Sequence, residues 1–263
     1  MGLFARLGAV LGVGAARVEL AIAAPQVCRG GLVRGELLME AGRAPQKVRL
    51  LSVDLYEYWI TGHGKSRSYH QRRHERVTLG EYLPVEPGFR EAYPFELHVP
   101  DDARCTRRRE GWEVRAEAHI PWSVDARSSS PLRVLPHPEV LAVQRAARDL
   151  LGLQPLEWDG RGPEVMYNFR APAWLRHLLD GVRFHLWVSE QSLEGRLDLN
   201  KQERGIGGAL GALVGADHEN VTITIPRAEL LTKRGSPNPP GAYEHLKVMF
   251  ERLGAVAPPL PER

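Results

Sequence analysis

The chain has 263 residues, with 35 Lys and Arg against 32 Asp and Glu, and a net charge of +3 at pH 7. Hydrophobic residues make up 43% and charged residues 25%, which is the balance of a globular protein and excludes a disordered chain, a collagen or a continuous coiled coil. No run approaches the roughly 18 uninterrupted apolar residues that a membrane-spanning helix needs, so we expect no membrane span.

The cysteine content indicates a cytoplasmic protein, and the net charge does not predict a nucleic-acid binder. Thirty of the 35 basic residues are arginines, but nucleic-acid recognition requires cationic side chains gathered on one face, and the net charge is small. Cys28 and Cys105 form no CxxC pattern and fit a reducing compartment, where both thiols stay free. A disulfide between them and a homo-oligomer are both left open by the sequence.

The first 16 residues, MGLFARLGAVLGVGAA, carry one charge, at Arg6. Their apolar residues recur at helical spacing, which predicts an amphipathic strap packed on its own domain. A secretion signal is the alternative, because small residues end the segment. Its apolar middle is short, however, and is interrupted by Gly8 and Gly12.

Alternation of apolar and polar residues dominates the first half of the chain. Successive side chains of a strand point to opposite faces, so each run has one face to bury and one face in water. The run from Val48 to Leu55 slips by one residue, which predicts a bulge. Turn residues rather than helices separate the runs, and this order favours an antiparallel β-sandwich. The runs lie at 18–22, 33–39, 48–55, 93–99, 112–120 and 132–134.

A helix is predicted after the last of these strands. Pro138 stands near its start and Gly152 just after its end, the usual placement of both residue types at helix termini. We expect this segment, 137–152, to be a linker helix between two bodies. The N-terminal domain then spans 1–136, and the C-terminal domain, with a loose tail, spans 153–263.

Alternation returns in the C-terminal domain, together with two helical patterns. The expected fold class is therefore all-β, with two antiparallel β-sandwich domains, a linker helix and a few short helices. Strands are predicted at 184–188, 193–199 and 221–225, helices at 206–214 and 243–253, and loops at 235–241 and 258–263.

Several segments, in this order and at this spacing, resemble bacterial sporulation-control proteins of the arrestin-like superfamily. The chain departs from the family pattern at Ala103 and Cys105 and in the basic segment 63–76. The similarity covers most of residues 1–233. The segments that carry it are the turn region 25–35, FELHVPD (95–101), the strand 112–120, VDAR (124–127), VLPHP (134–138) and NKQERGIGGA (200–209).

The resemblance implies a pair of arrestin-like β-sandwiches without catalytic residues and without a cofactor. Members are regulatory or scaffolding proteins that contact other cellular proteins. We therefore expect a non-enzymatic adaptor that binds unidentified partner proteins through sheet edges or through a groove between its domains. The sequence itself agrees with the expected lack of catalytic residues in one respect, because it contains no GxSxG nucleophile motif.

The histidines His63, His70 and His74 do not predict a metal site. On a strand, the Cα atoms of His70 and His74 lie about 13 Å apart, too far for both rings to reach one zinc ion. The surrounding segment also lacks the apolar stripe of a helix, on which the two rings would meet. We interpret the segment as a solvated basic hairpin and expect no metal and no cofactor.

The glycine-rich run after residue 204 is the basis of the alternative function. It has part of the dinucleotide-binding fingerprint but lacks the preceding buried strand and the acidic residue about twenty positions later. Close packing of a helix on a sheet explains the glycines equally well. A helix start can still attract an anion, so small-anion or nucleotide binding at Arg204, Gly205, Gly207 and Gly208 remains the alternative.

Two basic clusters, within 65–76 and 104–109, are the remaining candidates for a binding surface. Such a charge run is usually a solvated face. Tyr69 and Trp112 lie nearby in the sequence, so single-stranded nucleic acid, lipid headgroups and acidic proteins are all open as ligands. Our hypothesis is electrostatic steering of a protein partner, with Arg72, Arg73, Arg76, Arg107 and Arg108 as the candidate residues.

Overall fold

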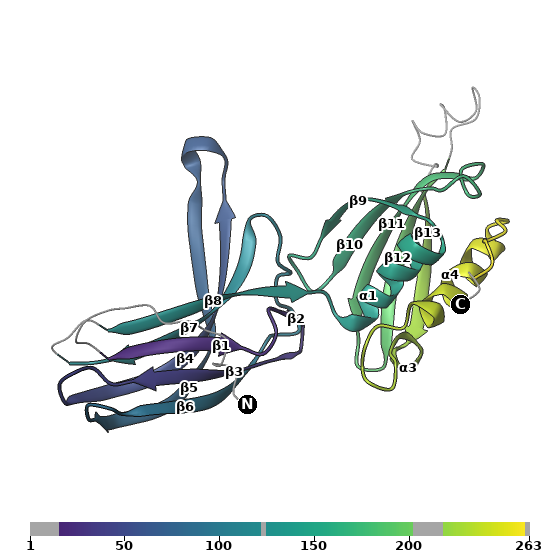
Figure 1. Cartoon of the computed structure of the whole chain (residues 1–263). Helices are drawn as coiled ribbons and strands as arrows, with labels where there is room; N and C mark the ends of the chain where they lie inside the picture. Colours follow the sequence, from purple (N-terminus) through teal and green to yellow (C-terminus); the bar gives the residue numbers. More distant parts are fainter. Residues whose placement is uncertain (1–15, 122–124, 202–217, 261–263) are drawn as a thin grey trace. The chain divides into compact units, whose positions relative to one another are not determined.

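The computed structural model describes residues 16–121, 125–201 and 218–260 (Figure 1). The chain divides into two compact units, one ending at Leu135 and the other beginning at Pro136. Strands predominate in both units, which confirms the predicted all-β class. The predicted helix 206–214 and all but the last residue of the predicted strap fall outside the described ranges.

The first unit is a sandwich of two sheets. One sheet has the strand order β1-β3-β6 and the other the order β2-β8-β7-β4-β5. Their inner faces share one core, in which Leu37, Leu55, Leu97 and Val114 have no exposed surface. The elements are β1 (Arg17–Ile22), β2 (Gln26–Cys28), β3 (Leu32–Glu40), β4 (Gln46–Thr61), the 3-10 turn η2 (Gly64–Ser66), β5 (Ser68–Val85), β6 (Arg90–His98), β7 (Glu110–His119) and β8 (Ala126–Leu135).

Pairing in this unit follows the predicted antiparallel pattern with one exception, because β2 runs parallel to β8. The register between β4 and β5 shifts between Leu51 and Ser52 and again between Leu55 and Tyr56. The first shift lies inside the run whose slip predicted a bulge, so that prediction is confirmed. Bulges increase the local twist of a strand pair, and here they precede the part of the hairpin that leaves the sandwich.

The second unit contains one antiparallel sheet, with strand order β13-β12-β11-β10-β9 in the described residues. Its predicted strands at 184–188, 193–199 and 221–225 are confirmed as parts of β11, β12 and β13. The elements are α1 (Pro138–Arg145), the π-helical segment η3 (Ala146–Leu150), β9 (Gln154–Asp159), β10 (Val165–Arg170), β11 (Leu179–Val188), β12 (Ser192–Lys201), β13 (His218–Pro226), α3 (Arg227–Leu230) and α4 (Pro239–Arg252).

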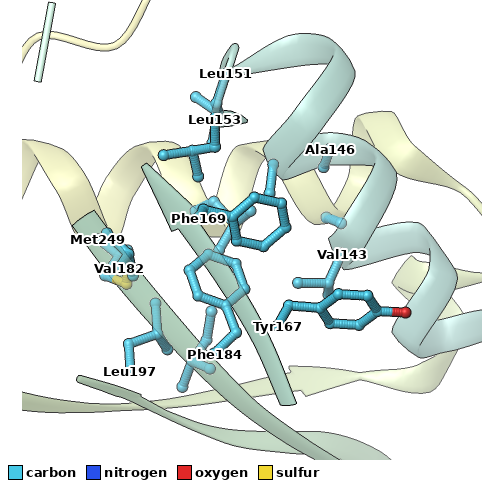
Figure 2. Packing of buried hydrophobic residues seen from close by; sticks show 14 of the residues in the cluster. Val143, Ala146, Leu151, Leu153, Tyr167, Phe169, Val182, Phe184, Leu197 and Met249 are labelled. Carbon is cyan, nitrogen blue, oxygen red and sulfur yellow. The ribbon is translucent and has the colours of Figure 1, made fainter. Parts of the chain in front are cut away.

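Helices rather than a second sheet cover one face of this sheet, which differs from the sandwich expected for the second domain. The core joins Val143 and Ala146 of the first helical segment and Met249 of α4 to Phe169 and Phe184 of the sheet (Figure 2). Alternation in a strand shows that one face is buried but not which element covers it. Both helices supply apolar stripes that complete the layer.

The helix that the sequence analysis placed between two bodies is consequently part of the second unit. It begins at Pro138 as predicted, continues as η3, and ends before Gly152, whose φ of 71° is the left-handed conformation that favours glycine after a helix. The predicted loop 235–241 is shorter than expected, because α4 begins at Pro239. Proline is favoured in the first turn of a helix, where the backbone N–H has no partner to lose.

Candidate protein-binding surface

The β4–β5 hairpin carries the predicted basic segment. Its tip projects from the sandwich, in which the rest of both strands lies (Figure 1). Pairing of β4 with β7 ends at Trp59, whereas pairing of β4 with β5 continues to Thr61 opposite Ser68. The turn contains Gly62 and Gly64, with φ of 75° and 57°, so two left-handed residues close the hairpin.

One face of the hairpin base is built around a buried carboxylate. The side chain of Glu57 is 6% exposed, and its Oε2 lies 2.8 Å from Nε2 of His74. Its Oε1 lies 3.1 Å from Nε of Arg104. Glu57 stands opposite Trp112 in the β4–β7 register, which places it on the core side of the sheet. Sequence reasoning missed this group, although a carboxylate that continues the phase of Val53 and Leu55 is a recognisable signal.

Aromatic rings extend this cluster towards the hairpin tip. The guanidinium of Arg104 lies 4.5 Å from the centre of the Trp59 ring, and the His70 ring stacks on the same indole at 5.3 Å. The His70 Nε2 also lies 2.8 Å from Oγ1 of Thr61. Cation–π contact and stacking hold these side chains in place at the base of the exposed tip.

The structure brings the two basic clusters together, although about thirty residues separate them in the sequence. Nη1 of Arg109 donates to the carbonyl oxygen of Gly62 at 3.2 Å, and the backbone N–H of Ile60 donates to the carbonyl oxygen of Arg109 at 2.9 Å. The loop that precedes β7 therefore lies against the hairpin stem. Two runs of arginines form one cationic region on the first unit.

The five candidate arginines have different environments. Arg76 donates to both carboxylate oxygens of Asp54, at 2.6 and 2.8 Å, and this hydrogen bonding raises the pKa of its guanidinium. Arg107 forms a tight backbone bridge with Glu110 at the start of β7. The remaining three candidates are exposed, and no ion pair joins them to another described residue: Arg72, Arg73 and Arg108.

Arg76 thus has a structural role, because Asp54 is buried and needs a cation beside it. The hollow beside this pair, of about 480 Å³, is lined by Tyr56, Arg115 and Arg127 among others. Its arginines are matched by Glu113 and Glu117, respectively. Since these charges are already paired, the hollow offers no excess positive charge to a small anion.

The alternative anion site and the histidines were the other candidate sites in the sequence. Arg204, Gly205, Gly207 and Gly208, the alternative anion site, lie outside the described residues. His70 contacts the hydroxyl of Thr61, and His74 contacts the carboxylate of Glu57. The described ranges hold no group of three His, Cys, Asp or Glu side chains arranged for a metal ion.

No disulfide joins Cys28 to Cys105, and Cys105 is buried. Burial raises the pKa of Cys105 to about 11, against the opposing influence of the nearby Arg29 guanidinium. At neutral pH this thiol is therefore almost entirely protonated and a poor nucleophile. The stabilisation that accompanies the raised pKa is fully present below pH 9 and is lost as the pH rises through 11.

Comparison with known proteins identifies the family. A family model described as SpoOM protein matches residues 4–162, more than half of the chain. The chain belongs to the SpoOM protein family. Its resemblance to sporulation-control proteins, inferred from ordered sequence segments, is confirmed by this match.

The sequence and the crystal structure of one relative, Spo0M of Bacillus subtilis, extend the comparison over nearly the whole chain. The sporulation-control protein spo0M of Bacillus subtilis (strain 168) is 24% identical over 241 residues, which are 88% of this chain and 93% of that protein. The crystal structure of Spo0M from Bacillus subtilis matches with a TM-score of 0.61 at 18% identity, covering 92% of this chain and 99% of that one. This likeness shows that the chain shares the overall fold of that protein.

No helix in the described ranges is both long enough and apolar enough to cross a bilayer.

Proposed function

We propose that this SpoOM-family chain is a non-enzymatic regulatory adaptor that binds a partner protein along the exposed tip of β5. The observation that carries the proposal is the position of β5, the outermost strand in the order β2-β8-β7-β4-β5. Its segment Ser68–Arg73, called the β5 edge segment below, is exposed apart from a half-buried His70. The sporulation-control name of the Bacillus subtilis relative supports a regulatory role.

An edge strand can recognise a partner without a pocket. Its outward N–H and C=O groups pair with an extended segment of another chain, and the side chains on either side select that segment. Arg72 stands opposite Glu57 in the register and Arg73 opposite Tyr56, so the two guanidinium groups lie on opposite faces of the hairpin. A strand added along this edge would pass between both cations.

The cationic character of the edge favours an acidic partner over a second copy. Identical basic edges repel one another when they approach, whereas an acidic strand is attracted to them. Tyr69 adds an aromatic anchor, because its ring stacks on Tyr58 at 6.1 Å and is nevertheless 58% exposed. Aromatic and arginine side chains dominate the energetics of many protein interfaces.

Charge reversal at the β5 edge segment is expected to abolish partner capture. We expect the Arg72→Glu/Arg73→Glu variant to recover at least about tenfold less partner than the wild type, because two attractive charges become repulsive. The measurement is a crosslinked pull-down from native cell extract, quantified by mass spectrometry. The matched control is Lys233→Glu/Arg234→Glu, which reverses two exposed cations in the second unit.

The control should recover the partner within about twofold of the wild type. Equal recovery by the β5 variant would contradict the proposed site. Failure of the wild type to recover any protein in repeated crosslinked experiments would contradict the adaptor function itself.

A further inference from the structure

The second unit has a groove between the edge of its sheet and a helix. β13 is the outermost strand in the order β13-β12-β11-β10-β9, and no described strand pairs with its outer side. A hollow of about 630 Å³ lies between β13 and α4. Its lining is mainly apolar and includes Val221, Ile223, Val248, Met249 and Leu253.

The lining differs from that of an ordinary solvated helix face. Val248 lines the groove from α4 and is 44% exposed, so its apolar surface is accessible to a ligand. Thr222 and Thr224 of β13 also line the groove. Together, an open strand edge and an apolar helix flank provide the two components that an extended peptide requires.

The direction of α4 follows from its contacts with α3. The side-chain amide of Asn238, just before α4, donates to the carbonyl oxygen of Glu229 at 2.8 Å, and His245 lies 2.7 Å from the Glu229 carboxylate. Since α3 follows β13 directly at Pro226, the start of α4 lies at the end of β13. The helix therefore runs antiparallel to the strand, with Arg252 towards Val221.

Charges divide the groove into two ends. Glu244 lines it near the start of α4, beside the contact of Glu229 with His245, whereas Arg252 lines it near the end of that helix. A peptide that pairs antiparallel to β13 has its N-terminal side at the acidic end and its C-terminal side at Arg252. Charge complementarity therefore favours a cationic residue first and a carboxylate last.

We propose that this groove binds an extended segment of a partner protein by antiparallel addition to β13, with a cation at its N-terminal side, apolar residues at alternate positions and a carboxylate at its C-terminal side. The lining from Val221 to Thr224 spans about 10 Å, so three or four residues of the peptide lie against it. The inference goes beyond the proposed function, because it concerns another edge in the other unit and neither depends on the other.

Fluorescence polarisation with two labelled heptapeptides tests this proposal on the full chain. In KTVTVTE the lysine, both valines and the glutamate face the helix, and in ETVTVTK the two charges are exchanged. We expect saturable binding of KTVTVTE and at least about tenfold weaker binding of ETVTVTK. The Arg252→Glu variant should weaken KTVTVTE by a similar factor.

Val248→Glu is the groove variant and Val256→Glu is its matched control, because Val256 is 82% exposed and does not line the groove. We expect Val248→Glu to weaken KTVTVTE at least about tenfold and Val256→Glu to bind it within about twofold of the wild type. Both positions are exposed, and circular dichroism of each variant verifies the fold. The Arg72→Glu/Arg73→Glu variant should bind this peptide as the wild type does, which separates the two surfaces.

Three results would overturn the proposal. They are the absence of saturable KTVTVTE binding up to about 1 mM, equal binding of the two peptides, and unchanged binding by Val248→Glu. A fourth result would come from sedimentation velocity. If the wild type were a dimer and Val248→Glu a monomer, the groove would bind a second copy of the chain instead.

Discussion

Replacing Arg227 by methionine is expected to lower the free energy of unfolding of the second unit by about 3 kcal/mol. Glu139 in α1 has no exposed surface, and its Oε1 lies 2.6 Å from Nε of Arg227 in α3. Its Oε2 is buried without a hydrogen-bond partner among the described residues. The substitution leaves a buried carboxylate without its counter-charge. We expect the low end of the range for buried pairs because the Arg227 side chain is 39% exposed.

A double variant and a surface pair make this prediction specific. Glu139→Leu/Arg227→Met removes both charges and should regain most of the lost stability, since the desolvation cost disappears with the carboxylate. Arg148→Met breaks a half-exposed pair with Asp149 in the same unit and should cost less than about 1 kcal/mol. Urea unfolding gives the free energies, and hydrogen exchange of peptides from β11 and β12 assigns the loss to this unit. A double variant as unstable as the single one would contradict the explanation.

Replacing Trp112 by alanine is expected to lower the free energy of unfolding of the first unit by about 4 kcal/mol. Trp112 is 1% exposed and is the largest fully buried side chain of the described residues. Its indole N–H donates to the carbonyl oxygen of Arg104 at 2.7 Å, and its ring packs on His74 with centres 4.7 Å apart. The substitution therefore opens a cavity and also releases the loop that carries Arg104.

Two further variants separate these contributions. Trp112→Phe keeps most of the ring volume but loses the hydrogen bond, so we expect a smaller loss than for alanine and faster hydrogen exchange in residues 104–109. Trp187→Ala, at an indole that is 36% exposed, should cost less than about 1 kcal/mol. A Trp112→Ala variant that unfolds at the same urea concentration as the wild type would show that the indole does not anchor this end of the core.

Most of the strands were predictable because their side chains alternate, although β10 alternates as well and was not predicted. Leu193, Leu197 and Leu199 lie on one face of β12 and are fully buried, as their spacing indicates. The same logic located the slip in β4. β9 was not predicted because it is an edge strand with little buried surface, and its residues Gln154–Glu157 are all exposed. A strand with no apolar face produces no period of two.

The covering layer of the second unit was not predictable from periodicity. Val143 and Ala146 belong to a helical apolar stripe that the sequence analysis recognised. Such a stripe has the same pattern whether its helix links two domains or covers a sheet. Only the long-range contacts with Phe169 and Phe184 decide between them. Linear patterns specify which residues are buried, whereas tertiary packing specifies their partners.

The binding surface was predicted in part for the same reason. The exposed cations Arg72 and Arg73 were recognised from local charge density. The pairing of Arg76 with Asp54 depends on strand register, and the contact of Arg109 with Gly62 joins segments 47 residues apart. The same hairpin thus carries a buried structural charge, Glu57, and the exposed cations Arg72 and Arg73.

Site-specific photocrosslinking at β5 tests the central claim most directly. Tyr69 and Tyr82 are matched positions, since they lie on the same strand and are 58% and 59% exposed. A benzophenone amino acid in place of Tyr69 should crosslink the partner protein in cell extract, whereas the same group in place of Tyr82 should not. Partner crosslinks at Tyr82 with none at Tyr69 would contradict recognition through the tip of the hairpin.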